Sequence, residues 1–173
     1  MDARLIKMLP NLKGEPLYIP FVGAIIERAH KGEKQVLVQI REKKDDLKYS
    51  GSLEIPGGKF RAFEDVYETL KREVKEECGL DITSIVGEDK RKNYLNREDS
   101  SDLIEPFCVT QMANGPFVGL IFLCKAEGKL LSKTNETKDS QWMDYRRLKE
   151  IVDKNSEQIY TAFLAPLKKY FNL

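Results

Sequence analysis

The sequence is poor in histidine and in the cysteine patterns that zinc binding or thiol catalysis would require. It contains one histidine, His30, and three cysteines, Cys78, Cys108 and Cys124, with no CxxC pair. One histidine is too few for a zinc site built on paired histidines, and it nearly excludes Ser-His-Asp or Cys-His catalysis. Three cysteines without such a pair indicate reduced thiols and predict a cytoplasmic protein. In an enzyme with this composition, carboxylates must carry most of the chemistry.

The sequence also lacks a strong net charge and a long apolar run. Lys and Arg number 29 against 28 Asp and Glu, a net charge of +1, so no global field attracts nucleic acid or an anionic membrane. The longest near-continuous apolar run, residues 18–26, contains Pro20 and Gly23 and is too short to cross a bilayer. Residues 1–14 lack the apolar core of a secretory signal. We therefore expect neither a membrane nor a nucleic acid as a partner.

The apolar patterning predicts one α+β domain over residues 1–173, with residues 1–16 as an N-terminal extension. Hydrophobic residues make up 41% of the chain, which is enough for one core. Strands are predicted over residues 17–28, 35–41, 52–55, 104–112, 116–126 and 141–145. Helices are predicted over residues 63–78, over a segment with Leu148, Ile151 and Val152 on one face, and within a C-terminal segment, 154–173, from about residue 156. This order of elements indicates an α/β/α sandwich around a mixed sheet.

The helix over residues 63–78 carries an acidic triplet beside its apolar stripe. At about 100° per residue, the stripe consists of Phe63, Val66, Tyr67, Leu70, Val74 and Cys78. Glu73, Glu76 and Glu77 lie along its edge, and Glu77 points into it. Repulsion costs about 0.2–0.5 kcal/mol per pair, and the helix dipole disfavours anions in the last turn by about 0.3–1 kcal/mol each. A hard divalent cation, Mg²⁺ or Mn²⁺, prefers oxygen ligands and would neutralise this cluster.

Residues 58–80 resemble the Nudix box. The fixed positions of the box are matched by Gly58, Glu64, Arg72, Glu73, Glu76, Glu77 and Gly79, and its aliphatic positions by Val74 and Leu80. The preceding LEIPGGK segment and the ending around Trp142 are also similar to the family, over roughly residues 17–153. The resemblance implies a Nudix-type sandwich with a catalytic loop and helix. It also implies a MutT-like hydrolase in which water attacks phosphorus in a nucleoside diphosphate linked to another group, such as a nucleotide sugar, ADP-ribose or a dinucleotide.

The same resemblance implies roles for the residues of the box. Metal ligands for Mg²⁺ or Mn²⁺ would come from Glu73, Glu76, Glu77 and a carbonyl of Gly57 or Gly58. Glu73 is alternatively a residue that orients the attacking water. Arg72 would hold Glu73 or Glu76 in place, and Glu64 would support the junction of loop and helix.

Other candidate residues lie outside the box. Glu136, six residues before Trp142, is the expected general base, with Asp139 as the fallback; the alternative for Glu136 is a solvated loop residue. Arg41 occupies a position where family members often place a phosphate-binding residue, and a solvated strand end is the alternative. Lys59, just past the glycine pair, is a second candidate for a phosphate contact.

Two further functions and the assembly of the protein are left open by the sequence. The first is a Nudix-fold sensor that binds a nucleotide without cleaving it, although such proteins usually have damaged boxes. The second is an isomerase such as isopentenyl diphosphate isomerase, for which one histidine is too few. The apolar segment with Leu5, Ile6, Met8 and Leu9 predicts a homodimer interface, or a flap over its own domain.

Overall fold

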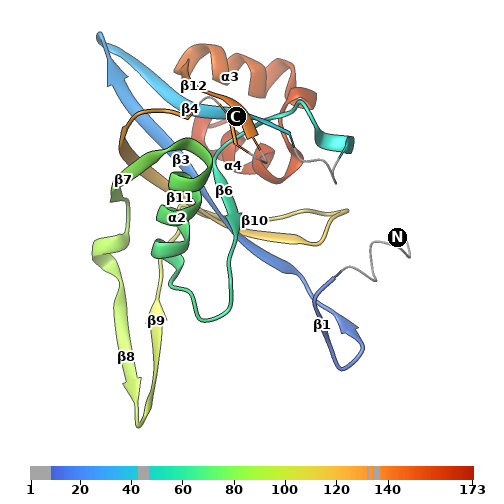
Figure 1. Ribbon diagram of the computed structural model, residues 1–173, viewed down its shortest axis with the longest axis vertical. Helices are drawn as coiled ribbons and strands as arrows, with labels where there is room; N and C mark the ends of the chain where they lie inside the picture. The colour runs from blue at the N-terminus through green and yellow to red at the C-terminus, as the bar shows by residue number, and fades with distance from the viewer. Residues whose placement is uncertain (1–8, 43–46, 132, 135–136) are drawn as a thin grey trace.

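The computed structural model describes residues 9–42, 47–131, 133–134 and 137–173, which form a curled sheet with helices on both faces (Figure 1). The helices are α2 (Val66–Cys78), α3 (Tyr145–Lys154) and α4 (Thr161–Phe171), with short 3-10 turns at Leu47–Tyr49, Glu88–Lys90 and Ser156–Gln158. The strands are β1 (Asn11–Leu12), β2 (Glu15–Pro16), β3 (Ile19–His30), β4 (Glu33–Arg41), β5 (Leu53–Glu54), β6 (Gly57–Lys59), β7 (Leu80–Ile85), β8 (Lys92–Asn96), β9 (Asp99–Leu103), β10 (Cys108–Gln111), β11 (Phe117–Gly128) and β12 (Thr137–Asp144).

Strand β3 organises the main sheet, whose order is β10-β11-β3-β4-β12. β3 runs parallel to β11, and it pairs antiparallel with β6 over its first half and with β4 over its last residues. β5 pairs with β4, and β7 pairs with the end of β11. β6, the strand that precedes α2, is therefore anchored directly on one of the two longest strands of the sheet.

Alternating residues of β3 and β4 enter two different hydrophobic clusters. Phe21, Ile25, Val36 and Val38 pack with α3 and α4 on one face, whereas the intervening Val22, Ala24, Ile26 and Leu37 pack with α2 on the other. Side chains of a strand alternate between the faces of its sheet, so this division follows from the period of two. It confirms the predicted α+β sandwich with a mixed sheet and places α2 opposite the two C-terminal helices.

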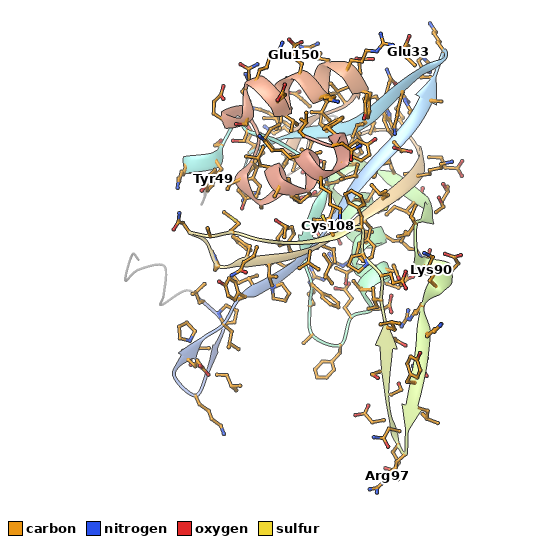
Figure 2. The ribbon with its side chains drawn as sticks, turned by 180° about the vertical axis from the view of Figure 1, so that it is seen from behind. Glu33, Tyr49, Lys90, Arg97, Cys108 and Glu150 are labelled. Carbon is orange, nitrogen blue, oxygen red and sulfur yellow. The ribbon has the colours of Figure 1, made fainter. Side chains whose placement is uncertain are left out.

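Two hairpins extend away from the packed layers (Figures 1 and 2). The hairpin of β8 and β9 has every strand residue exposed, and Figure 2 shows Arg97 at its tip. The smaller hairpin of β1 and β2 is exposed throughout as well. Within the described part of the chain, no helix is long and apolar enough to span a membrane.

The structure corrects several predicted boundaries. The helix predicted from residue 63 begins at Val66, because Asp65 caps it, and Phe63 is fully exposed with a φ of 66° rather than part of the apolar stripe. The strand predicted over 104–112 covers only Cys108–Gln111, and β7, β8 and β9 were not predicted. The C-terminal segment forms a 3-10 turn and then α4, which continues through Pro166.

Candidate active site

Helix α2 is fixed at both ends by local hydrogen bonds. The Asp65 side chain accepts from the backbone N–H groups of Tyr67 and Glu68, the arrangement expected of an N-cap. Gly79 ends the helix with a φ of 76°, a conformation that residues with a Cβ rarely adopt. The predicted stripe from Val66 to Cys78 is buried, so the packing of α2 sets where its acidic residues point.

The three glutamates of the acidic triplet differ strongly in exposure. Glu77 is 6% exposed, the Glu73 side chain is 13% exposed, and the Glu76 side chain is 57% exposed. The helical wheel predicted this position for Glu77, within the apolar stripe, and the structure confirms it. A carboxylate this deeply buried requires hydrogen-bond donors or a counter-charge around it.

Arg72 is the centre of an ion-pair network that includes two members of the triplet. Its guanidinium donates from Nε and Nη2 to the two oxygens of Glu64, at 2.6 and 3.0 Å. Its Nη1 donates to Glu73 Oε1 at 2.6 Å and to Glu76 Oε2 at 3.2 Å. The bonds from Arg72 lower the pKa of Glu64 to about 2, and the carboxylates, Glu64 foremost, raise the pKa of Arg72. Arg72 thus contacts both Glu73 and Glu76, the residues that the resemblance implies it would hold, and pairs with Glu64 just before the helix.

Glu77 is held by donors that lie outside the helix. Its Oε2 accepts from Gln39 Nε2 on β4 at 2.8 Å and from the backbone N–H of Gly57 on β6 at 3.0 Å. Gln39 Nε2 also lies 3.4 Å from Glu54 Oε1, and Gln39 Oε1 accepts from the Cys78 thiol at 3.2 Å. Burial raises the pKa of Cys78 to about 12, so its thiol remains a donor at neutral pH.

Gln39 and Glu54 are buried residues of this site that the sequence analysis missed. The available signal was the alternation along β4, which places Gln39 on the same face as the buried Leu37. A polar residue at an inward-facing strand position needs a buried partner, and here the partner is Glu77.

The glycine pair before α2 allows the backbone to approach the acidic residues closely. A Cβ on Gly58 would lie 2.1 Å from Glu73 Oε2, and a Cβ on Gly57 would lie 2.2 Å from the carbonyl oxygen of Val22. A side chain at Gly57 would collide with the main chain of β3, and a side chain at Gly58 would displace the Glu73 carboxylate. The requirement agrees with a loop whose main chain takes part in the site.

The donor set fits a hard divalent cation. Carboxylates and backbone carbonyls are the ligands that Mg²⁺ and Mn²⁺ prefer, and Gly58 brings the main chain against the Glu73 carboxylate. Among the described residues, no three acidic, histidine or cysteine side chains are arranged so that they could hold one ion. The contacts of Glu73 and Glu76 with Arg72, and of Glu77 with Gln39, account for the directions in which these carboxylates turn.

The remaining predicted residues occupy quite different surroundings. Arg41 is buried, which excludes the solvated strand end; its Nη1 lies 3.1 Å from Glu54 Oε2 and its guanidinium 4.2 Å from the ring centre of Tyr160. Lys59 is exposed at the end of β6. Asp139 is exposed in β12 with a φ of 52°. Glu136 lies outside the described residues.

Comparison with known proteins assigns the family. Residues 18–163 match the NUDIX domain. A NUDIX hydrolase from Nitrosomonas europaea is 18% identical with a TM-score of 0.62, covering 91% of this chain and 72% of that one. A MutT protein from Methanosarcina mazei Go1 is 22% identical with a TM-score of 0.57, covering 90% and 94%.

A third fold relative is the NUDIX domain of Shewanella oneidensis NrtR, solved with ADP ribose; it is 16% identical with a TM-score of 0.53, covering 87% of this chain and 88% of that one. No curated protein matches this chain. The family match covers most of the chain, and the solved structures share its fold. The chain therefore belongs to the Nudix hydrolase family, a family of pyrophosphohydrolases.

Proposed function

We propose that this protein uses Mg²⁺ or Mn²⁺ to hydrolyse a pyrophosphate bond in a nucleoside diphosphate linked to another group. Candidate substrates are nucleotide sugars, ADP-ribose and dinucleotides. The observation that carries the proposal is the junction of β6 with the C-terminal half of α2. There the backbone N–H of Gly57 donates to Glu77 Oε2 at 3.0 Å, and Gly58 lies so close to Glu73 that a Cβ at this position would displace the Glu73 carboxylate.

The cation would be held by Glu73, Glu76, Glu77 and a carbonyl of Gly57 or Gly58. When bound, it would supply charge stabilisation for the transferring phosphorus and activate water at neutral pH. The residues of the chain then have separate tasks. The Glu73 carboxylate lies against Gly58 and is a candidate to orient the attacking water, and the hydrogen bond from Arg72 restrains its orientation.

Binding of the substrate phosphates is proposed for Lys59 and Arg41. The exposure of Lys59, one residue beyond Gly58, supports a direct contact. Arg41 is engaged with Glu54 and the Tyr160 ring, so a phosphate contact by Arg41 would require exchange of that ion pair. Glu136 remains the proposed general base, with Asp139 as the alternative.

We propose a cytoplasmic homodimer as the form in which the protein acts. Of the residues predicted to form an N-terminal contact, Leu5, Ile6 and Met8 lie outside the described residues. Leu9 is the first residue that the structure describes. The neighbouring β1–β2 hairpin exposes Leu12, and Leu17 and Tyr18 are exposed just after it, which supports an apolar contact there. Light scattering at micromolar concentration should give twice the monomer mass, and a monomer mass would contradict the dimer.

The function is tested with a panel of ADP-ribose, nucleotide sugars and dinucleoside polyphosphates. The protein is incubated with each compound and Mg²⁺ or Mn²⁺, and release of nucleoside monophosphate is measured. We expect release from at least one compound and its loss on chelation by EDTA. Binding of a compound by calorimetry without any release would instead favour a nucleotide sensor on the Nudix fold.

A further inference from the structure

A buried polar layer joins the acidic triplet to two strand residues, Gln39 and Glu54, that lie outside the segment resembling the Nudix box. It consists of Gln39 on β4, Glu54 on β5 and the end of α2 at Glu77 and Cys78. Gln39 is fully buried, and its amide is surrounded by the two carboxylates and the thiol. Because a buried amide is costly unless its hydrogen bonds are made, this placement calls for a specific function or a specific structural reason.

The neighbours of Gln39 determine how its amide is oriented. The two carboxylates accept hydrogen bonds, so the NH₂ group must face Glu77 Oε2 and Glu54 Oε1, at 2.8 and 3.4 Å. The amide oxygen then faces the Cys78 thiol, which donates to it at 3.2 Å. Rotating the amide by 180° would set its oxygen against both carboxylates. One orientation is therefore strongly favoured.

Glu77 is consequently held from two strands at once. Gln39 belongs to β4 and Gly57 to β6, and both donate to the same oxygen of Glu77. Two donors on one oxygen, directed from different strands, fix the position and rotation of the carboxylate. The donor on Gly57 is part of the main chain, whereas the donor on Gln39 is a side chain that a substitution can change.

We infer that Gln39 is a positioning residue that holds the Glu77 carboxylate in the orientation needed to bind a divalent cation, and that Cys78 keeps the Gln39 amide in register. This inference rests on the proposed function, which makes Glu77 a metal ligand. Removal of a residue that hydrogen-bonds to a metal ligand and orients it typically weakens metal affinity by about 10–100-fold.

The test is direct Mn²⁺ binding, measured by the electron paramagnetic resonance signal of free Mn²⁺ with no substrate present. Gln39→Met preserves the approximate volume and removes both hydrogen-bonding groups. We expect its dissociation constant for Mn²⁺ to rise about tenfold. Gln35→Met is the matched control, because Gln35 lies on the same strand and its amide oxygen bonds Arg28 Nε instead. The control should bind Mn²⁺ as the wild type does.

Three further variants keep the test decisive if Gln39→Met folds poorly. Gln39→Asn retains an amide that is one methylene shorter, so it should fold and still bind Mn²⁺ more weakly than the wild type. Cys78→Ser keeps a donor towards Gln39 and Cys78→Ala removes it, so Mn²⁺ affinity should fall further in Cys78→Ala. Melting in EDTA measures the structural cost of each substitution separately.

The outcomes separate this inference from the proposed function. Unchanged Mn²⁺ affinity in Gln39→Met or Gln39→Asn, accompanied by a lower melting temperature, would overturn the positioning role and leave Gln39 as a residue of the core. A wild-type protein that binds Mn²⁺ but releases no monophosphate from any compound would contradict hydrolysis. In that case weaker Mn²⁺ binding by the Gln39 variants would still support the positioning role.

Discussion

Glu68 and Glu77 lie on the same helix, and their surroundings are opposite. The Glu68 side chain is 66% exposed and pairs with Lys71 at 3.0 Å, in the arrangement of an ordinary surface ion pair. Glu77 is 6% exposed and receives hydrogen bonds from a buried amide and a main-chain N–H. The difference shows that the side of α2 on which a glutamate lies, and the strands packed against that side, determine whether its carboxylate is solvated or buried.

The largest expected effect follows from removing the charge of Glu77. Glu77→Gln retains an oxygen that can accept from Gln39 and Gly57, but it loses the charge that a cation requires. We expect monophosphate release to fall by at least about a hundredfold. The melting temperature in EDTA should stay within about 4 °C, the shift that corresponds to about 1 kcal/mol in a domain of this size. Near-normal turnover would show that the contrast between the two glutamates has no catalytic meaning.

A smaller effect is expected from a side chain added at Gly58. In Gly58→Ala the new Cβ would lie 2.1 Å from Glu73 Oε2, so the Glu73 carboxylate must move away from the loop. Because a shift of about 1 Å in a residue that positions reacting groups can slow the reaction by up to a hundredfold, kcat should fall by about tenfold to a hundredfold. Gly115→Ala is the control, since its Cβ would meet only the flexible side chain of Met112. Equal kcat in both variants would exclude a role for close approach at Gly58.

The acid stability of the junction depends on Glu64. Its pKa is lowered to about 2 by Arg72, so the stabilisation is complete above the pKa of the unfolded chain, about 4.3, and is lost as the pH falls towards 2. The melting temperature should therefore fall more steeply between pH 5 and pH 2 in the wild type than in Glu64→Gln. The same dependence of melting temperature on pH in both proteins would indicate that the bidentate pair with Arg72 does not persist in solution.

The smallest effect is expected for Glu68→Gln. Exposed ion pairs contribute about 0–1 kcal/mol, and Lys71 retains its contact with Glu88 at 3.1 Å. Monophosphate release should stay within about twofold of the wild type, since no transition-state interaction is removed. A loss as large as that of Glu77→Gln would remove the distinction between the two positions on α2.

The helix and its acidic residues could be predicted because their signals are local. The spacing of Val66, Leu70 and Val74 determines the buried face of α2, and the same spacing places Glu77 within it. Phe63 was assigned wrongly because its spacing also fits that face, whereas the Asp65 cap begins the helix three residues later. Competition between a periodic pattern and a capping residue is decided by hydrogen bonds that spacing alone does not reveal.

The missed features have two physical causes. The β8–β9 hairpin is fully exposed, so its strands carry no alternation between apolar and polar residues that could identify them. Gln39 and Glu54 were missed because a polar residue in a strand normally faces water. Their burial depends on contacts between β4, β5 and the end of α2, which are distant from one another in the sequence.

The parallel pairing of β3 with β11 has a consequence for the order in which the chain acquires its structure. The hairpin of β3 with β4 and the helix α2 involve neighbouring segments, and these can form early. The pairing of Ile19 with Phe117 requires the chain to close a very long loop, which is entropically costly. Until β11 has been synthesised, one edge of β3 has no partner, and an unpaired strand edge is a site at which a nascent chain can aggregate.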